Sequence, residues 1–417
     1  RAAYQLRTSK APEAIAPLWR AYQAESADGP GRSIASALVE LKLSDPGAAG
    51  FLVARLDPAK NKLWNSDVQL LQHLGGVEAV TALRGAAEGS DDRIRSAAID
   101  ALAETKDAGG VGALIDLAGR TGFAHQEEVI RTLNWRKKTE ALPALRRIVA
   151  DAGAPAKVRG QAGQALGNMK DAQGVSALLT AASDADAELY VTALRALDSI
   201  GGKEARAPAV AALGSRHASV RARAADSLRA GKSADALAPL WRGYQAETEQ
   251  GAGRDMVSAL VELRFADPAA SGFLSGRLDP ARNKLWSSDV RLLQHLGGAE
   301  AIAALRRAAE GSHDQLRGEA IEALAEAKDP GGVAALIELM EQATFAHRDA
   351  VIERGFDLRR PQLALVEAAG LHGAEDDIER LGGAEARDPG IEHLRPHAAP
   401  ISPAAKCLAL AAGLSTQ

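Results

Sequence analysis

The sequence predicts an all-α protein, a right-handed α-solenoid (superhelix) of short helical hairpins with an internal tandem duplication of about 222 residues. A large block of the chain recurs at a constant shift, and a shorter leucine repeat runs inside that block. The composition agrees, because the chain is 46% hydrophobic but only 4% aromatic. Small aliphatic side chains suit closely packed helices, and Ala and Leu are among the strongest helix formers.

The duplication is visible in four matching segments. APLWR begins at Ala16 and again at Ala238, 222 positions later, and NKLW, LLQHLGG and FAH recur at the same shift. About two-thirds of the positions from 16 to 130 are identical in the second copy, more than shared helix composition would give. We therefore divide the chain into a first solenoid block, residues 1–222, and a homologous second block, residues 223–417, which diverges after about residue 353. The shift aligns Arg1 with Arg223, so we expect the first block to begin within a repeat, as in a segment of a longer protein.

A shorter repeat lies within the blocks. Leucines occupy equivalent places at nearly constant spacing, and they are Leu102, Leu133, Leu166, Leu197 and Leu228. Around them, apolar residues recur at helical spacing, a short Asp/Gly turn follows, and a second apolar stripe begins. We expect the carboxylate of Asp171, in one such turn, to cap the following helix. A hairpin of this length cannot bury its stripe alone, so neighbouring hairpins should stack into a continuous core.

Two segments carry a family resemblance. IRSAAIDALAETKDAGGVGALIDLA, from Ile94, and VRGQAGQALGNMKDAQGVSALLTAA, from Val158, each contain a helix with Arg in second place, an Asp/Gly turn and a second helix. They resemble HEAT repeats of the short, phycobilisome-lyase-like type, most closely over residues 91–240 and 313–339. The resemblance implies a solenoid that binds something, but it names no partner, because function resides in sites placed on a fold.

Bulk properties narrow the classes of partner. The net charge of −4 disfavours a nucleic-acid footprint spread over the molecule. No stretch of 18 consecutive apolar residues is present, so we expect no membrane span. The single cysteine, Cys407, excludes an intrachain disulfide framework and is expected in an Ala/Leu helix as a small buried residue. A cytoplasmic location is slightly favoured, and the oligomeric state stays open.

We expect no catalytic, cofactor or metal site. Metal sites need several converging ligands, and the sequence has no HExxH motif. Deoxyhypusine hydroxylase, a HEAT-repeat metalloenzyme, places His-Glu pairs on its helices, and this sequence contains no such dipeptide. Two histidine pairs recur in the copies, His73 with His295 and His125 with His347, and a histidine beside a helix-terminal glycine more often binds C-terminal carbonyls.

Two further patterns are assigned structural roles. The arginines second in their helices should meet an acidic turn residue of the neighbouring hairpin rather than line a groove for an anion; they are Arg95, Arg159, Arg221 and Arg317. The stretch DGPGRS, from Asp28, lacks the Gly-Lys-Ser/Thr ending of a phosphate loop. We expect it to connect two helices.

The strongest candidate for a binding site is a loop that both copies share. The segment RLDPAKNKLW, from Arg55, recurs as RLDPARNKLW, and it interrupts the shorter repeat. Tryptophan and arginine are favoured at interaction hot spots, and lysine with tryptophan could bracket an acidic peptide. The candidate partner-binding residues are Arg55, Lys62, Trp64, Arg277, Lys284 and Trp286. The alternative is that the tryptophans seal hairpin junctions, that Ser66 and Ser288 cap helices, and that the cations are solvated.

Together these observations predict a non-enzymatic scaffold for a protein or peptide partner, with two equivalent stations, one in each block. Such a scaffold could be a segment of a larger multi-domain protein or assembly. The alternative function is a lyase-like or chaperone-like auxiliary that holds a prosthetic group, an expectation that rests on the family resemblance.

Overall fold

The computed structural model describes residues 2–342, except residues 46, 184, 203–205, 268 and 328. Within that range every regular element is a helix, which confirms the predicted all-α class. Predictions about His347 and Cys407 lie outside the described residues. The chain divides into two compact units, residues 1–208 and 209–417. The predicted block boundary after residue 222 falls within a helix of the second unit.

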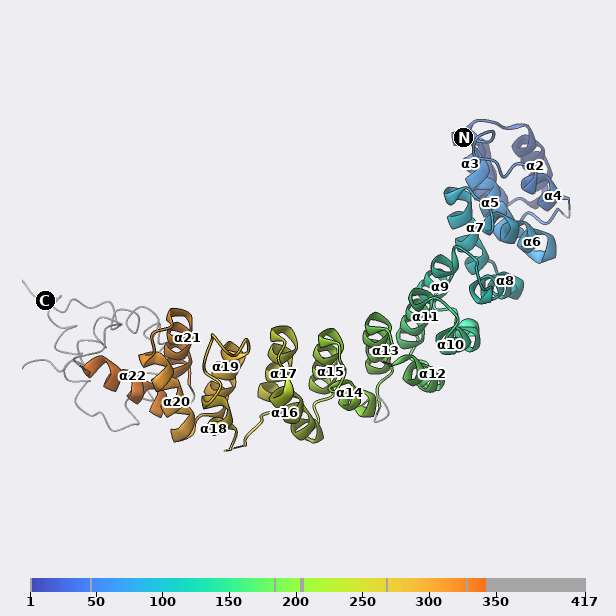
Figure 1. Ribbon diagram of the computed structural model, residues 1–417. Coiled ribbons are helices and arrows are strands. Elements are labelled where there is room, and N and C mark those ends of the chain that lie inside the picture. The colour runs from blue at the N-terminus through green and yellow to red at the C-terminus, as the bar shows by residue number, and fades with distance from the viewer. Residues whose placement is uncertain are drawn as a thin grey trace, which may run out of the picture. The chain divides into compact units, whose positions relative to one another are not determined.

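In the first unit the helices alternate along the chain between two layers (Figure 1). The first layer contains α1 (Ala2–Ser9), α3 (Asp28–Glu40), α5 (Trp64–Leu74), α7 (Asp92–Glu104), α9 (Gln126–Trp135), α11 (Ala156–Asn168) and α13 (Ala187–Ile200). The second layer contains α2 (Ile15–Ala24), α4 (Ala48–Val53), α6 (Gly76–Ala87), α8 (Ala108–Gly119), α10 (Leu142–Ala150) and α12 (Val175–Ala181). Consecutive first-layer helices pack side by side from α1 to α13, and second-layer helices do so from α4 to α12. This one-dimensional stacking is an α-solenoid.

The second unit repeats the arrangement. Its first-layer helices are α15 (Ala218–Ala230), α17 (Gln250–Glu262), α19 (Trp286–Leu296) and α21 (Asp314–Ala325). Its second-layer helices are α16 (Leu237–Ala246), α18 (Ala270–Ser275), α20 (Gly298–Glu310) and α22 (Gly331–Glu341). A further helix, α14 (Arg206–Ala212), crosses the division between the units. Short 3₁₀ turns precede some second-layer helices; they are η1 (Pro12–Ala14), η2 (Thr139–Ala141), η3 (Ala172–Gly174) and η5 (Ala234–Ala236). No described helix combines the length and apolar character that crossing a bilayer requires.

The periodic leucines form the core, as predicted. All five are buried, and Leu102, Leu133 and Leu166 have no exposed surface. Each lies on a first-layer helix that packs against at least one adjacent first-layer helix of its unit. Full burial of a leucine side chain is worth about 1.5–3 kcal/mol. The stacking of neighbouring repeats is therefore the main source of stability.

Turns after first-layer helices use basic residues in a left-handed conformation. Lys42 has φ 62° and follows the C-cap of α3. The next amide, Leu43 N, donates to Leu38 O at 2.9 Å, which is the Schellman closure of a helix C-terminus. Among the described residues, the non-glycine residues with positive φ are Lys10, Lys42, Lys137, Lys170, Lys232 and Arg264. A cation at this end of a helix is favoured by the helix dipole, which helps to offset the strain of the left-handed backbone.

The arginines that are second in their helices satisfy backbone carbonyls. Arg95 donates to Gly89 O at 3.4 Å, and Arg221 donates to Ser215 O at 2.8 Å. Arg159 and Arg317 donate to Val149 O and Gly311 O. The predicted contact with an acidic residue of the neighbouring hairpin holds for Arg95, which reaches Glu128 in the first turn of α9. It is wrong for Arg221, which reaches Glu247 at the end of α16 in its own hairpin, and for Arg317, which pairs with Asp314 of its own helix. The carbonyls lie in the last turn of α10 or shortly after α6, α14 and α20, so the shared role of the arginines is to bind carbonyls at helix ends.

Two local predictions are wrong. The stretch DGPGRS is the first turn of α3 rather than a connection. Its proline is tolerated there because the first amides of a helix have no intrahelical partner. Asp171 occupies an N-cap position but makes no capping hydrogen bond. Its two oxygens instead accept from Arg146 Nε at 2.6 Å and Arg146 Nη2 at 2.7 Å.

We predict that Gly110→Ala lowers the free energy of unfolding by about 1–3 kcal/mol, because overpacking forces the surroundings to shift. A Cβ atom at Gly110 would overlap Leu102 O and Thr105 Cγ2. The control Gly112→Ala lies in the same helix with no atom within 4 Å of its Cβ, and it should gain up to about 1 kcal/mol. Urea unfolding followed by circular dichroism measures both. Equal effects of the two substitutions would contradict the close approach at Gly110.

Candidate functional site at the repeated loops

The two RLDPA-x-NKLW segments form equivalent loops. Residues 55–64 connect α4 to α5, and residues 277–286 connect α18 to α19. In the first loop Asn61 Nδ2 donates to Arg55 O at 2.9 Å, and Asn61 Oδ1 accepts from Leu63 N at 2.9 Å. The second loop has the same two bonds at the same lengths, with Asn283, Arg277 and Leu285. One asparagine amide thus closes each loop.

A buried carboxylate anchors each loop to its helices. Asp67, in the first turn of α5, has no exposed surface. It accepts from Tyr22 Oη of α2 at 2.7 Å and from Asn61 Nδ2 at 2.6 Å, and Arg55 Nε lies 3.5 Å from its Oδ2. In the second copy the corresponding distances to Asp289 are 2.6 Å, 2.6 Å and 3.3 Å, from Tyr244, Asn283 and Arg277. Equivalent residues of the two copies therefore support both loops in the same way.

Burial controls the ionisation of this network. Loss of solvation raises the pKa of Asp67 even though the phenol of Tyr22 and the guanidinium of Arg55 lower it. Burial likewise raises the pKa of Asp289 to about 6. The phenol pKa of Tyr22 and of Tyr244 is also raised, mainly by burial and then by the neighbouring carboxylate. At neutral pH the second network therefore pairs a protonated phenol with an ionised carboxylate.

The predicted arginines lie inside the support of the loops. The side chain of Arg55 is 16% exposed, and its guanidinium lies 5.2 Å from the ring centroid of Tyr22 and 5.1 Å from that of Phe51. Arg277 makes the equivalent contacts with Tyr244 and Phe273. A guanidinium held by a carboxylate and two ring faces stabilises the loop, and little of it reaches the surface.

The predicted lysines and tryptophans reach the surface. Lys62 and Lys284 are exposed, two residues before the tryptophans that begin α5 and α19. Trp64 is half-buried and packs against the core of the first unit. Trp286 is also half-buried, and its ring centroid lies 6.1 Å from that of His313. Each loop therefore presents a cation and part of an indole on a single turn.

The alternative role expected of two serines is wrong. Leu63 and Leu285 occupy the N-cap positions of α5 and α19, where no side-chain cap bond forms. Ser66 and Ser288 lie inside the first turn and are buried. The starts of these helices are held instead by the loop asparagine, which binds the N-cap amide and the buried aspartate of the first helical turn.

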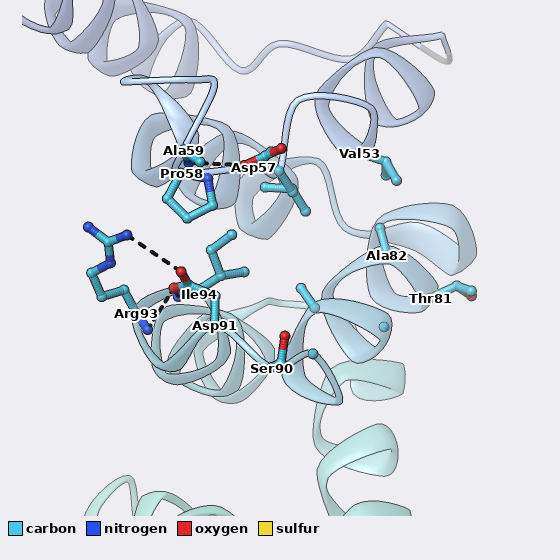
Figure 2. A pocket seen from close by; sticks show the side chains of 14 residues that line it. Val53, Asp57, Pro58, Ala59, Thr81, Ala82, Ser90, Asp91, Arg93 and Ile94 are labelled. Atoms are coloured by element: carbon cyan, nitrogen blue, oxygen red, sulfur yellow. Dashed lines mark hydrogen bonds and ion pairs between the residues drawn. The ribbon is translucent and has the colours of Figure 1, made fainter.

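A pocket of about 710 Å³ opens beside the first loop (Figure 2). Figure 2 shows Asp57 and Pro58 of the loop across the opening from Asp91 and Ile94 at the start of α7. The remaining wall comes from α4, from α6 and from the turn after α6. The lining residues are Val53, Leu56, Asp57, Pro58, Ala59, Thr81, Ala82, Gly85, Ala86, Gly89, Ser90, Asp91, Arg93 and Ile94. Its size and largely apolar lining are typical of ligand-binding pockets.

Two carboxylates at this pocket are ionised at neutral pH. A hydrogen bond from Lys60, 3.1 Å away, lowers the pKa of Asp57. Backbone bonds from Ile94, and from Arg93 as well, lower the pKa of Asp91, the N-cap of α7. Among the described residues, no group of three or more His, Cys, Asp or Glu side chains could hold a metal ion.

The loop was predictable from the sequence, but the wall of the pocket was not. The residues of α6 that line it, Gly85 among them, have an ordinary helical pattern. A signal was nevertheless present, because the counterpart of Gly85 in the second copy is Arg307. A change from no side chain to a long cationic one marks a place where the two copies differ in shape and charge.

Comparison with known proteins agrees with this architecture. A family model of HEAT repeats matches residues 80–167, 150–229 and 175–261. The chain is similar to solved structures of Kap121p (TM-score 0.54, 12% identity), Kap121p bound to Nup53p (0.53, 11%) and Kap121p bound to Pho4p (0.52, 11%). In the same order, the matches cover 90%, 89% and 88% of this chain but only 48%, 47% and 47% of the Kap121p chains. This chain therefore spans about half the length of those proteins. At such identities the likeness shows the fold alone. No curated protein matches the sequence.

We predict that Tyr244→Phe lowers the free energy of unfolding by about 1.5–3 kcal/mol, because a buried carboxylate loses a hydrogen bond. Tyr22→Phe should have a similar cost, since Asp67 and Asp289 have matching partners. Urea unfolding at pH 7 provides the measurement. A loss below about 0.5 kcal/mol, the usual size of a surface substitution, would contradict an anchoring role for the phenols.

We also predict a pH effect that Asp289→Asn removes. The pKa of Asp289 is raised from 3.8 to about 6 by folding, so the folded chain holds this proton more tightly than the unfolded chain does. The stability contributed by the residue should therefore fall as the pH rises from 3.8 to about 6 and stay constant above that range. The test is the difference in unfolding free energy between wild type and Asp289→Asn across this range. A difference that increases with pH would show that the pKa is not raised.

Proposed function

Because residues 80–261 match a family model of HEAT repeats, we propose that the chain is a non-enzymatic scaffold that holds a protein or peptide partner at its two RLDPA-x-NKLW loops. The observation that supports this most directly is the placement of an exposed lysine beside a half-buried tryptophan in both loops. The partner contacts would come from Lys62 and Trp64 in the first loop and from Lys284 and Trp286 in the second.

The rigidity of the loops favours a binding role. Each is closed by an asparagine and tied to the helix layers by a buried aspartate. A site whose side chains are held in place by such contacts loses less conformational entropy when a partner binds. Arg55 and Arg277 were also predicted to contact the partner, but they fit better as supports of the loop, because their guanidinium groups already bind the buried aspartate of their own copy.

The solved structures are consistent with a scaffold. Two of the similar structures are of Kap121p bound to Pho4p and of Kap121p bound to Nup53p. In those proteins a solenoid of this kind therefore holds another protein. By this analogy the present chain would also hold a protein, and the chemistry of its own loops would decide which one.

The proposal predicts that Trp64→Ala combined with Trp286→Ala weakens binding of a partner isolated with the full chain. Each tryptophan hot spot is worth about 2 kcal/mol or more, roughly thirtyfold in affinity. Lys62→Glu with Lys284→Glu is a second variant, which changes exposed side chains and leaves the core intact. Isothermal titration calorimetry measures the affinities.

Trp135→Ala serves as the control, because Trp135 is 80% exposed and lies at the end of α9, outside both loops. It should leave the affinity unchanged. If neither loop variant weakens binding, the partner site is not at the loops. If Trp135→Ala alone weakens it, the site lies on α9.

A further inference from the structure

The two copies differ most informatively at the pocket beside the first loop. Position 85 is glycine on α6, and the equivalent position of the second copy is Arg307 on α20. Arg307 Nη2 donates to Ser275 Oγ at 2.8 Å, so its side chain reaches from α20 to the end of α18. The counterpart of Ser275 is Val53, which is 42% exposed and lines the open pocket. In the second copy an arginine of the chain itself thus spans the two helices whose counterparts border the pocket in the first.

The pocket of the first copy has room for a side chain that the chain does not supply. A Cβ atom at Gly85 would have no heavy atom within 4 Å. Leu56, Ala86 and Ile94 give the pocket an apolar wall, against which the methylene stem of an arginine or lysine packs well. The volume of about 710 Å³ exceeds one side chain and would also admit the flanking residues of a peptide.

The charge at the opening favours a cation. Asp57 and Asp91 line the pocket with Arg93, whereas the counterpart of Asp91 in the second copy is His313. Asp57 pairs with Lys60, whose side chain is 86% exposed, and Asp91 pairs at 3.5 Å with Arg93, which is 66% exposed. Exposed ion pairs of this kind contribute little energy. An incoming guanidinium could therefore replace Lys60 or Arg93 at these carboxylates at small cost.

We propose that this pocket binds a basic side chain, arginine foremost, of the partner that the scaffold holds. The stem of the side chain would lie against Leu56 and Ile94, and its guanidinium would meet Asp57 and Asp91. The inference rests on the proposed scaffold function and specifies the ligand of its first station. The second station, with Arg307 in place, would not share this preference.

The test uses the full chain and a fluorescein-labelled peptide, Gly-Ser-Leu-Arg-Leu-Ser-Gly. Citrulline in place of arginine keeps the shape of the side chain and removes its charge, and norleucine keeps an apolar stem alone. Fluorescence anisotropy at low salt measures binding of each peptide. The key variant, Gly85→Arg, introduces the residue of the second copy into an exposed helix position where arginine is a better helix former than glycine.

We expect the arginine peptide to bind saturably and Gly85→Arg to weaken it about tenfold or more, because the introduced side chain occupies the pocket. Gly112→Arg is the matched control, since Gly112 also lies within a helix with no atom within 4 Å of its Cβ. It should change the affinity by less than about twofold, within the usual range for independent surface sites. Asp57→Asn should weaken the arginine peptide and leave the norleucine peptide unaffected.

Three outcomes would overturn the inference. The first is that Gly85→Arg leaves the affinity within about twofold of wild type, the range expected of an independent surface site. The second is that the citrulline or norleucine peptide binds as tightly as the arginine peptide. The third is that the arginine peptide shows no saturable binding up to about 1 mM, the weak limit of specific recognition. The peptide test does not depend on Trp64 or Trp286. If the arginine peptide binds and the tryptophan variants still bind the partner as tightly as wild type, the pocket is retained and the loops are refuted as the partner site. If the tryptophan variants lose the partner and the arginine peptide does not bind, the loops are retained and the pocket is refuted.

Discussion

The shape of each repeated loop depends on a carboxylate that has no access to water. Asp67 and Asp289 have no exposed surface, and their oxygens are satisfied by a phenol, an amide and a guanidinium of the same copy. The helices that precede these loops, α4 and α18, have six residues each, too few to cover an apolar stripe as the longer hairpins do. Polar contacts therefore supplement the apolar packing where the regular repeat is interrupted.

This support is the same in both copies, whereas the surface beside it is not. The tyrosine, asparagine, arginine and aspartate recur with nearly equal distances. At the pocket, Gly85 and Asp91 correspond to Arg307 and His313. A buried network tolerates little change, because each unsatisfied member would cost free energy. The side chains around the opening are free of that constraint, so the surfaces beside the two loops can differ in shape and charge.

The regular part of the fold was predictable because it follows from spacing. Leucines at nearly constant intervals identify the first-layer helices, and the short turns between apolar stripes identify the hairpins. The first turn of α3 was not predicted, because glycine and proline near a helix start look like a connection. Gly31 is suited to that turn, since a Cβ atom there would overlap the side chain of Leu63, a contact between distant positions of the chain that no local pattern reveals.

The site was predictable in part. The repeated loop stood out as a sequence, and its lysines and tryptophans do reach the surface. The inward role of Arg55 was not foreseen, because its partners Tyr22 and Asp67 come from helices on either side of the loop. The pocket depends in the same way on α4, the loop, α6 and α7 together. Only the packed fold brings these four elements around one opening.

The bond between Tyr22 and Asp67 has a mechanical consequence. It joins residues 45 positions apart, a separation longer than one repeat. Other solenoid contacts link a helix to its nearest neighbours and can be lost one hairpin at a time. In a chain stretched from its ends, this bond would resist the separation of α2 from α5, and the equivalent bond between Tyr244 and Asp289 would resist the separation of α16 from α19.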